Sequence, residues 1–508
     1  MGRDTVKRPM LYVAAFCIAV SAFAFYELMI IFVFCIILLC GAIYHTMFVF
    51  HAKGVLLSAL MFLGIIGIFL AYNHVNSFDR VSGKVLNVTL VATEDSVGHE
   101  GFVTVPVRVV DGDLPFGSKL EPMDYNSTFI HAGDVFDAKV SVYSLRDSEY
   151  RRYNYSNGIY CNSVIEFKSS AKRINHIYKS LQSVRNYVTD RLFSDLRYDV
   201  AATLNAVMTG DKAYLEKDFS DSIKLTGVSH VMVVSGQHLV IIMNSLFFVL
   251  DKLFYNRYFR LLMSTAVGLF MIAVCGFTVS IVRAGIMFFV SAAAPVIGRE
   301  RDSLSSLATA VFIIIFLTPF AVYSLSFQLS VLATFGILAF SPCFCDLAAE
   351  MLKKIHLSFL KPVTDIIVNT LAATVTTLPV LIGTFGYISV VAIITNLLIT
   401  YAVTLALTFA AAAMLFGMFP PIYKFFLFIA GVSTKYINYV ISTVSKFSIT
   451  TVSIENRILQ YCLVVLSVLI IIALLISAGL IEKRKRLKRI NKTNGGAEKC
   501  LQFTAKMC

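Results

Sequence analysis

Apolar runs of about 20 residues recur along most of this chain, and each is close to the length that an α-helix needs to cross a membrane. They fall into two groups, three runs near the amino terminus and nine in the second half. The runs lie at about 9–26, 28–50 and 54–72, and then at about 230–250, 259–276, 278–297, 304–321, 324–340, 363–382, 388–416, 421–445 and 458–481. The pattern therefore predicts a polytopic α-helical membrane protein with about twelve transmembrane helices, arranged as three plus nine.

The polar segment between the two groups has a different periodicity. Apolar and polar residues alternate in 80–91 and in 101–110, which is typical of half-buried β-strands. Further candidate strands lie at about 125–131, 134–145 and 158–167, which makes about five strands within 78–170 and suits a small all-β, OB-like barrel. Residues 171–226 carry apolar residues at helical spacing among mixed charges, which predicts amphipathic helices on the membrane surface.

Composition and charge add an orientation. With 57% hydrophobic and 15% charged residues, the chain is too apolar for a soluble protein, and its net charge of +13 is concentrated at particular loops. Basic residues follow the first, third and fifth of the nine runs and fill the tail, whereas the opposite loops carry almost none; they are Lys252, Arg257, Arg260, Arg299, Arg301, Lys353, Lys354 and the run 483–489. The positive-inside rule then places both termini in the cytoplasm and residues 78–226 outside it.

These boundaries give five segments. We expect an anchor of three helices at 1–77, the OB-like domain at 78–170, surface helices at 171–226, the nine-helix membrane domain at 227–481, and a basic tail at 482–508. The tail is interpreted as cytoplasmic, and it is also suited to contact anionic lipid or nucleic acid.

The predicted β domain is acidic. Residues 78–170 contain nine Lys or Arg and thirteen Asp or Glu, a net charge of minus four. Because this charge repels phosphates, we interpret its aromatic residues Phe102, Phe129, Phe136 and Tyr143 as core residues rather than as platforms on which bases stack.

The entrance to the nine-helix part is unusually polar. Read as one helix, His230, Gln237 and Asn244 fall on nearly the same side, flanked by His238, while Ser235 and Gly236 mark where the helix loosens or begins. Such residues are costly in hydrocarbon, so they either line a path for a polar substrate or join helices by hydrogen bonds. Other polar residues within predicted spans are also candidates for a lining; they are Arg283, Gln328 and Asn396.

Enzymatic chemistry is not evident. Acidic residues of the nine-run part lie near the ends of the runs, so paired carboxylates within the membrane are not predicted. His230 and His238 lack the neighbouring ligands of a metal site. Ser235 with His238 could serve an intramembrane hydrolase, but two residues on one segment do not supply a complete triad. A phosphate-binding loop of the Gly-x-x-x-x-Gly-Lys type is also missing from the sequence, and no cofactor is expected.

Short motifs along the chain resemble the ComEC/Rec2 family of competence proteins. In chain order they are Thr209-Gly210-Asp211, Thr226-Gly227-Val228-Ser229-His230, Ser235-Gly236-Gln237-His238, Val282-Arg283-Ala284, Gly298-Arg299, Ser326-Phe327-Gln328-Leu329-Ser330, Leu378-Pro379 and Thr395-Asn396. The polar insert resembles the family's amino-terminal OB-like domain through Gly133-Asp134, Tyr153-Asn154-Tyr155 and Gly158-Ile159. One departure is Gln237, which stands where the family usually has an apolar residue.

The resemblance implies a channel for single-stranded DNA in natural transformation, with the candidate residues above as its lining. It also implies a location in the lipid bilayer of the cytoplasmic (inner) membrane of the cell. Further implied partners are a DNA receptor outside, a separate nuclease and a cytoplasmic translocation motor, and the resemblance is compatible with an oligomer. Many family members carry a metallo-β-lactamase-like domain, but the motif His-x-His-x-Asp-His does not occur here, so no binuclear nuclease is expected from these residues. A transporter of small solutes or lipids with the same fold is the alternative.

Overall fold

The computed structural model describes residues 9–24, 54–99, 101–126, 129–146, 148, 150–169, 171, 173–229, 236–276, 278–354, 356–447, 450–454 and 456–477. These residues form two compact units. The first consists of residues 1–221, 229–328 and 401–439, and the second of residues 222–228, 329–400 and 440–508, in each case as far as they are described. Each unit is considered by itself below.

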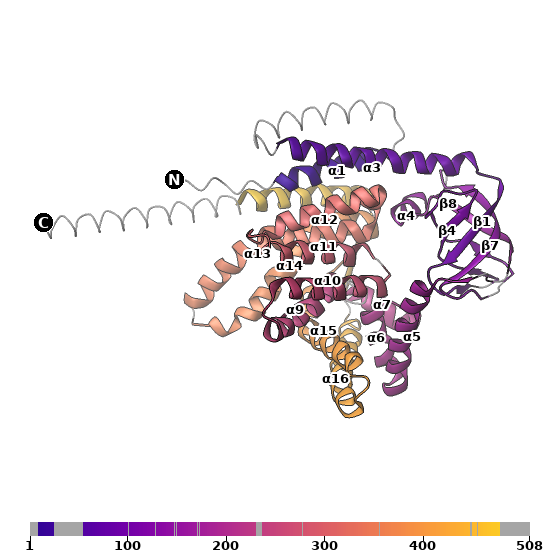
Figure 1. Ribbon diagram of the computed structural model, residues 1–508. Helices are drawn as coiled ribbons and strands as arrows, with labels where there is room; N and C mark the ends of the chain where they lie inside the picture. Colours follow the sequence, from indigo (N-terminus) through magenta and orange to yellow (C-terminus); the bar gives the residue numbers. More distant parts are fainter. Residues whose placement is uncertain are drawn as a thin grey trace. The chain divides into compact units, whose positions relative to one another are not determined.

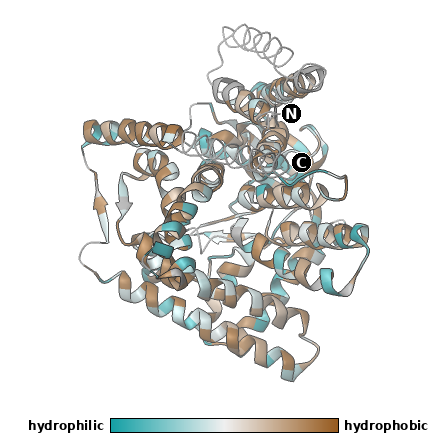
Figure 2. Ribbon diagram, turned by 90° about the vertical axis from the view of Figure 1, so that its left-hand side faces the viewer, coloured by the Kyte–Doolittle hydropathy of each residue, from teal (hydrophilic) through white to brown (hydrophobic). Residues whose placement is uncertain are grey.

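Long apolar helices dominate the described residues (Figures 1 and 2). Their bounds are α1 Pro9–Ala24, α3 Gly54–Arg80, α5 His176–Asp195, α6 Tyr198–Thr209, α7 Lys217–Leu225, α9 Gly236–Leu253, α10 Arg257–Val274, α11 Val279–Ala293, α12 Ser303–Leu317, α13 Leu325–Lys354, α14 Lys361–Phe385, α15 Ala392–Leu415, α16 Pro420–Val444 and a last helix Arg457–Ser477, with the 3-10 turns η2 Pro319–Tyr323 and η3 Ser358–Leu360. Among the described residues, seven helices are long and apolar enough to span a membrane, and α11 and α12 are shorter apolar helices. The structure therefore agrees with a polytopic membrane protein.

Helices occupy all nine of the predicted runs in the second half of the chain, but two predicted helices are longer than expected. Helix α3 continues to Arg80 instead of ending at about 72, and α13 continues to Lys354 instead of 340 with Pro342 in its interior. The extension of α3 is mainly polar and that of α13 includes the charged residues Asp346, Glu350, Lys353 and Lys354, whereas hydropathy detects only the apolar part of a helix. The predicted run at 28–50 lies outside the described residues.

The insert folds as a β domain at the end of α3. In the residues described, nine strands form one sheet, with bounds β1 Val85–Ala92, β2 Val97–His99, β3 Phe102–Thr104, β4 Val107–Gly112, β5 Lys119–Leu120, β6 Met123–Asp124, β7 Asp134–Ser144, β8 Cys161–Lys168 and β9 Arg173–Ile174. The order is β2-β3-β6-β8-β7-β1-β4-β5, and β9 pairs with β7. Lys119 in β5 also makes a parallel bridge with Ile159, just before β8. This bridge brings β5, at one end of the strand order, next to the start of β8, so that the sheet curls back on itself as a barrel requires.

Three expectations about this domain are wrong. The candidate strand at 125–131 does not form in its described residues, because β6 ends at Asp124 and β7 begins at Asp134. The run 101–110 is not one strand, because Pro106 separates β3 from β4 and the two strands pair with different neighbours. Of the four aromatic residues assigned to the core, only Phe136 is buried there, while Phe129 and Tyr143 are exposed. In β7 the alternation points Val142 inward and Tyr143 outward, so aromatic character alone did not decide burial.

The β domain is joined to α3 by polar contacts. Asp79, in the last turn of α3, pairs with Arg146 at 2.7 Å and accepts a hydrogen bond from Ser144 at 2.6 Å. Phe78 of the same turn is buried in the core of the β domain. The end of α3 is therefore part of the β domain as well as of the apolar helix.

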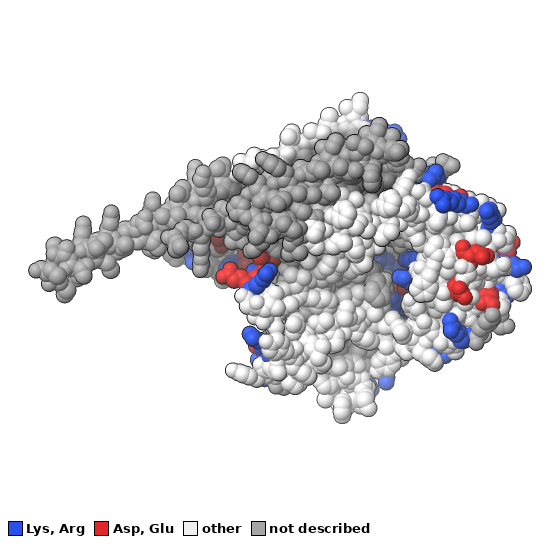
Figure 3. Space-filling model, turned by 45° about the horizontal axis from the view of Figure 1, so that its top comes forward, with Lys and Arg blue, Asp and Glu red and all other residues white. Residues whose placement is uncertain are grey.

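An aromatic cluster joins the β domain to the helix bundle. Tyr155, in the short helix α4 Arg151–Ser156, packs against Phe320 of η2 with ring centroids 5.5 Å apart, and Tyr160 packs against both. Figure 3 shows the charged residues gathered mainly over the β domain, while the visible helical surface is mostly uncharged. This contrast is expected where one part faces water and the other faces lipid.

Candidate functional site

The start of α9 lies directly against α11. A Cβ atom on Gly236 would lie 2.9 Å from the Cβ of Ala284, 3.0 Å from Nη2 of Arg283 and 3.0 Å from the carbonyl oxygen of Ser280. Only a glycine fits this contact without a shift of the helices. The motif that begins α9 and the motif Val282-Arg283-Ala284, far apart in the sequence, therefore meet in space.

Arg283 is buried within this contact. Its side chain is 7% exposed, and its Nη1 lies 3.3 Å from the Sδ atom of Met287, one turn further along α11. A thioether is only a weak hydrogen-bond acceptor for an arginine. The burial places Arg283 inside the first unit rather than at its surface.

The start of α13 joins the same place. Ser280 of α11 and Ser326 of α13 have their Oγ atoms 3.5 Å apart. Ser280 is thus the common neighbour of Gly236 and Ser326, and the amino-terminal ends of α9, α11 and α13 converge on it. The first N–H groups of a helix have no partner within the helix and carry partial positive charge. Three such ends therefore lie beside the buried Arg283.

Gln328, also predicted as a lining residue, has a structural partner. Its Nε2 donates to the carbonyl oxygen of Val322 at 2.8 Å, which ties the first turns of α13 to η2. The side chain is half-buried. Gln328 therefore fixes the direction in which α13 leaves η2.

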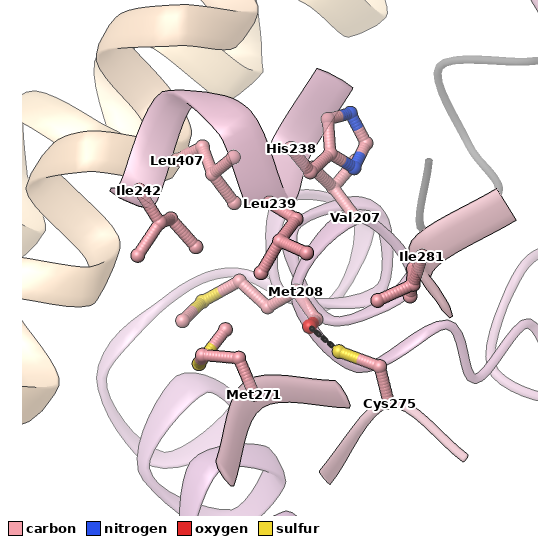
Figure 4. Close-up of a pocket in the computed structure, with 9 residues that line it drawn as sticks. All are labelled: Val207, Met208, His238, Leu239, Ile242, Met271, Cys275, Ile281 and Leu407. Carbon is pink, nitrogen blue, oxygen red and sulfur yellow. Dashed lines mark hydrogen bonds between the residues drawn. The ribbon is translucent and has the colours of Figure 1, made fainter. Parts of the chain in front are cut away.

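His238 borders a small apolar cavity (Figure 4). The cavity encloses about 10 Å³, roughly the space for one water molecule, and is lined by Val207, Met208, His238, Leu239, Ile242, Met271, Cys275, Ile281 and Leu407. His238 is 2% exposed, and its ring lies at the edge of the cavity, turned away from the two methionines. Cys275 Sγ donates to the carbonyl oxygen of Met208 at 3.7 Å.

The other residues of the predicted polar stripe do not share one environment. Asn244 is exposed, whereas His238 is buried. Gln237 lies in the first turn of α9, and His230 and Ser235 lie outside the described residues. The stripe of His230, Gln237 and Asn244 therefore stays a prediction, because only Asn244 of these three has a described side chain.

Asn396 belongs to the second unit. Its Nδ2 donates to Thr370 Oγ1 at 2.8 Å, which links α15 to α14. In the same unit Gly227 adopts a φ of +73° against Ser389 and Ala392, and Ser389 Oγ donates to the carbonyl oxygen of Leu225. These motif residues hold segments of the chain together by hydrogen bonds and close backbone approach.

Sequence reasoning missed one charged connection. Arg185 of α5 donates from Nε to the carbonyl oxygen of Val274, at the end of α10, and pairs with Glu94 of the β domain at 3.2 Å. A cation at the carboxyl-terminal end of a helix satisfies carbonyl groups that have no partner within the helix. Nothing in the spacing of α5 distinguishes Arg185 from its other basic residues, so the sequence offered no signal.

Among the described residues, no group of three or more His, Cys, Asp or Glu side chains could hold a metal ion. The side chains that meet at the starts of α9, α11 and α13 are those of Arg283 and of the neutral residues Ser280 and Ser326.

A family model described as competence protein matches residues 207–479, which is more than half of the chain. The chain belongs to the competence protein family. The match covers every helix from α9 to the last one. The matched region therefore contains the candidate residues Gly236, Arg283, Gln328 and Asn396. The β domain precedes the matched region.

The chain is similar to ComE operon protein 3 of Bacillus subtilis (strain 168). The two are 22% identical over 352 residues, which cover 68% of this chain and 43% of that protein. The competence protein described here thus spans less than half of its relative's length. No solved structure matches it.

Proposed function

We propose that this competence protein forms a membrane channel through which single-stranded DNA enters the cell during natural transformation. The proposal rests on the family, which is described as competence protein, and on one structural observation. That observation is the convergence of the starts of α9, α11 and α13 around Ser280 beside the buried Arg283.

This arrangement suits a polyanion. Helix amino termini attract phosphate through their N–H groups and their dipoles, and an arginine presents a planar fork that matches two phosphate oxygens. Neither interaction reads base identity, so a strand of any sequence would be accepted. In DNA uptake this indifference to sequence is what a general conduit needs.

Gly236, His238 and Arg283 are the lining residues that we favour, with His230, Ser235, Gln237 and Asn244 as neighbours along the same segment. Gln328 and Asn396 stay candidate lining residues as well, and each also holds a protein partner. Helices α9 and α11 are in close contact at Gly236, so passage of a strand would require them to separate there.

The finer layout is also part of the proposal. It has twelve spans, both termini in the cytoplasm and residues 78–226 outside the inner membrane, and it keeps the domain limits given above. The β domain is taken as OB-like because β1 pairs with both β4 and β7, and because β8 runs parallel to β6, as a closed five-stranded path requires. Partners would be a DNA receptor outside, a separate nuclease, and a cytoplasmic motor that supplies energy.

A catalytic role is not favoured. A hydrolase would need His238 to activate Ser235 with a third residue to orient it, whereas His238 borders a cavity lined mainly by aliphatic and sulfur-containing side chains. We therefore propose a transport protein and not an enzyme.

Uptake of labelled DNA by a strain that lacks this chain tests the function. We expect internalised label to fall to background, surface-bound label to remain, and a plasmid copy of the gene to restore uptake. Wild-type internalisation in the deletion strain would reject the proposal, and defective transport of a small solute with normal DNA uptake would favour the transporter instead.

A further inference from the structure

Phe116 is an apolar side chain held in an exposed position by a rigid turn. Its ring is 83% exposed. The turn runs from Pro115 to Ser118, where the Ser118 N–H donates to the Pro115 carbonyl oxygen at 3.2 Å, and Gly117 takes the positive φ of +79° that the third position of a type II turn needs. Gly117 is also held to Val109 in β4 by a 2.8 Å backbone hydrogen bond. The turn therefore presents Phe116 outward by construction.

The same turn is fixed at a defined height along α3. Ser118 Oγ lies 3.1 Å from Nε2 of His74. Up to Tyr72 the helix is almost entirely apolar, whereas Asn73, His74 and the residues that follow are mainly polar. The change from apolar to polar along a spanning helix marks the edge of the hydrocarbon layer. Phe116 therefore lies level with the membrane surface at the β-domain end of α3.

Two more exposed aromatic rings belong to the neighbouring part of the β domain. Tyr150 and Tyr153 are 70% and 67% exposed. Tyr150 directly precedes α4, and Tyr153 lies within it. Tyr155 of the same helix packs on Phe320 in η2, the turn directly after the apolar helix α12. Phe320 also clusters with Val75 of α3, one residue beyond His74, so the two regions share one level.

Aromatic rings at this level have a known preference. Tyrosine and other amphipathic rings gather where acyl chains meet headgroups, and exposed arginine such as Arg152 of α4 suits the phosphates above them. A phenylalanine that a rigid turn holds outside the core exposes its apolar ring to water, which is unfavourable compared with burial of that ring. We propose that Phe116, with Tyr150 and Tyr153, anchors the β domain in the lipid headgroup interface, so that this domain rests on the bilayer rather than standing free of it. The inference does not depend on the DNA-uptake role.

The chain contains no tryptophan, which makes the anchor directly measurable. Phe116→Trp would place a single tryptophan at the tip of the turn. The full-length protein would be reconstituted in phosphatidylcholine nanodiscs, with and without bromine atoms on the upper part of the acyl chains. Bromine quenches only nearby rings, so we expect roughly twofold or greater loss of fluorescence for a ring at the interface.

Val85→Trp is the matched control. Val85 is 56% exposed and is the first residue of β1, which follows α3 in the chain. Arg80, the last residue of α3, lies about 9 Å further along the helix than His74. Its fluorescence should be the same in both lipids. Tyr150→Trp and Tyr153→Trp test the anchor independently of the turn and should be quenched like Phe116→Trp. Equal emission of Phe116→Trp in the two lipids, or equal quenching of Phe116→Trp and Val85→Trp, would overturn the proposal.

Discussion

At the scale of single residues, glycines set how closely the helices of the site approach. A Cβ atom on Gly285 of α11 would lie 2.6 Å from Ile272 of α10, and one on Gly268 of α10 would lie 2.9 Å from Phe289 of α11. Gly236 has the same role between α9 and α11. Without a hydrophobic drive between helices in lipid, such close packing is a main source of their association.

Gly236→Ala should therefore weaken the protein. The added methyl group meets Ala284, Arg283 and the Ser280 carbonyl at about 3 Å, and overpacking of this kind costs roughly 1–3 kcal/mol. We expect a lower thermal midpoint in detergent. Gly383→Ala in α14 is the control, because among the described residues its new methyl would meet only Val464 at 4.0 Å. Its midpoint should stay equal or rise slightly. An unchanged midpoint for Gly236→Ala would contradict the contact.

At the scale of elements, Arg185 connects three parts of the first unit: α5, the end of α10 and the β domain. The hydrogen bond to the Val274 carbonyl serves the last turn of α10, whose carbonyl groups have no partner within the helix. The ion pair with the half-exposed Glu94, in contrast, is screened by water.

The two contacts can be separated by substitution. Arg185→Ala removes both and should cost roughly 1.5–3 kcal/mol, the usual loss of a hydrogen bond from a charged donor. Glu94→Gln removes only the ion pair and should cost less than about 1 kcal/mol. Thermal unfolding of the two variants measures the difference. Equal losses would show that the ion pair, and not the helix end, carries the stabilisation.

The sequence predicted where helices and strands lie along the chain better than which of them contact one another. Apolar length alone located α9 to α16 and the last helix, because the bilayer requires apolar runs of a set length. It did not show that Gly236, Arg283 and Ser326 meet, since each motif is local and their approach depends on tertiary packing. The alternation in β7 and β8 was visible, but the exposure of Phe129 depends on how the loop before β7 lies, which no local pattern records.

At the scale of the whole molecule, orientation in the membrane is a prediction that two adjacent residues can test. Cys161 is buried in the β domain, and burial raises the pKa of its thiol to about 12, so the reactive thiolate is scarce at neutral pH. Asn162, the next residue, points to the surface.

The raised pKa of the Cys161 thiol also has a consequence for stability. The neutral thiol favours the folded state below about pH 9, the ordinary pKa of a cysteine, and this contribution is lost as the pH approaches 12.

Asn162→Cys should be labelled in intact cells by a membrane-impermeant maleimide, while Cys161 of the same protein stays unlabelled until the protein is denatured. Mass spectrometry of the modified peptide distinguishes the two positions. The predicted layout places residues 78–226 outside the inner membrane, so an outer membrane, where present, must first be made permeable. Labelling of Asn162→Cys only after the inner membrane is broken would reverse the topology.

The central claim is that the starts of α9, α11 and α13 around Arg283 contact DNA during its passage. Uptake of labelled DNA by Arg283 variants tests this claim most directly. A bidentate contact to phosphate is lost with glutamine and partly kept with lysine, so uptake should fall by about tenfold or more in Arg283→Gln and to an intermediate level in Arg283→Lys. Arg257→Gln removes the same charge at the exposed start of α10, the opposite end of the α9–α10 hairpin, and should keep wild-type uptake. All variants must be present in the membrane at equal abundance. Wild-type uptake by Arg283→Gln under that condition would contradict the account.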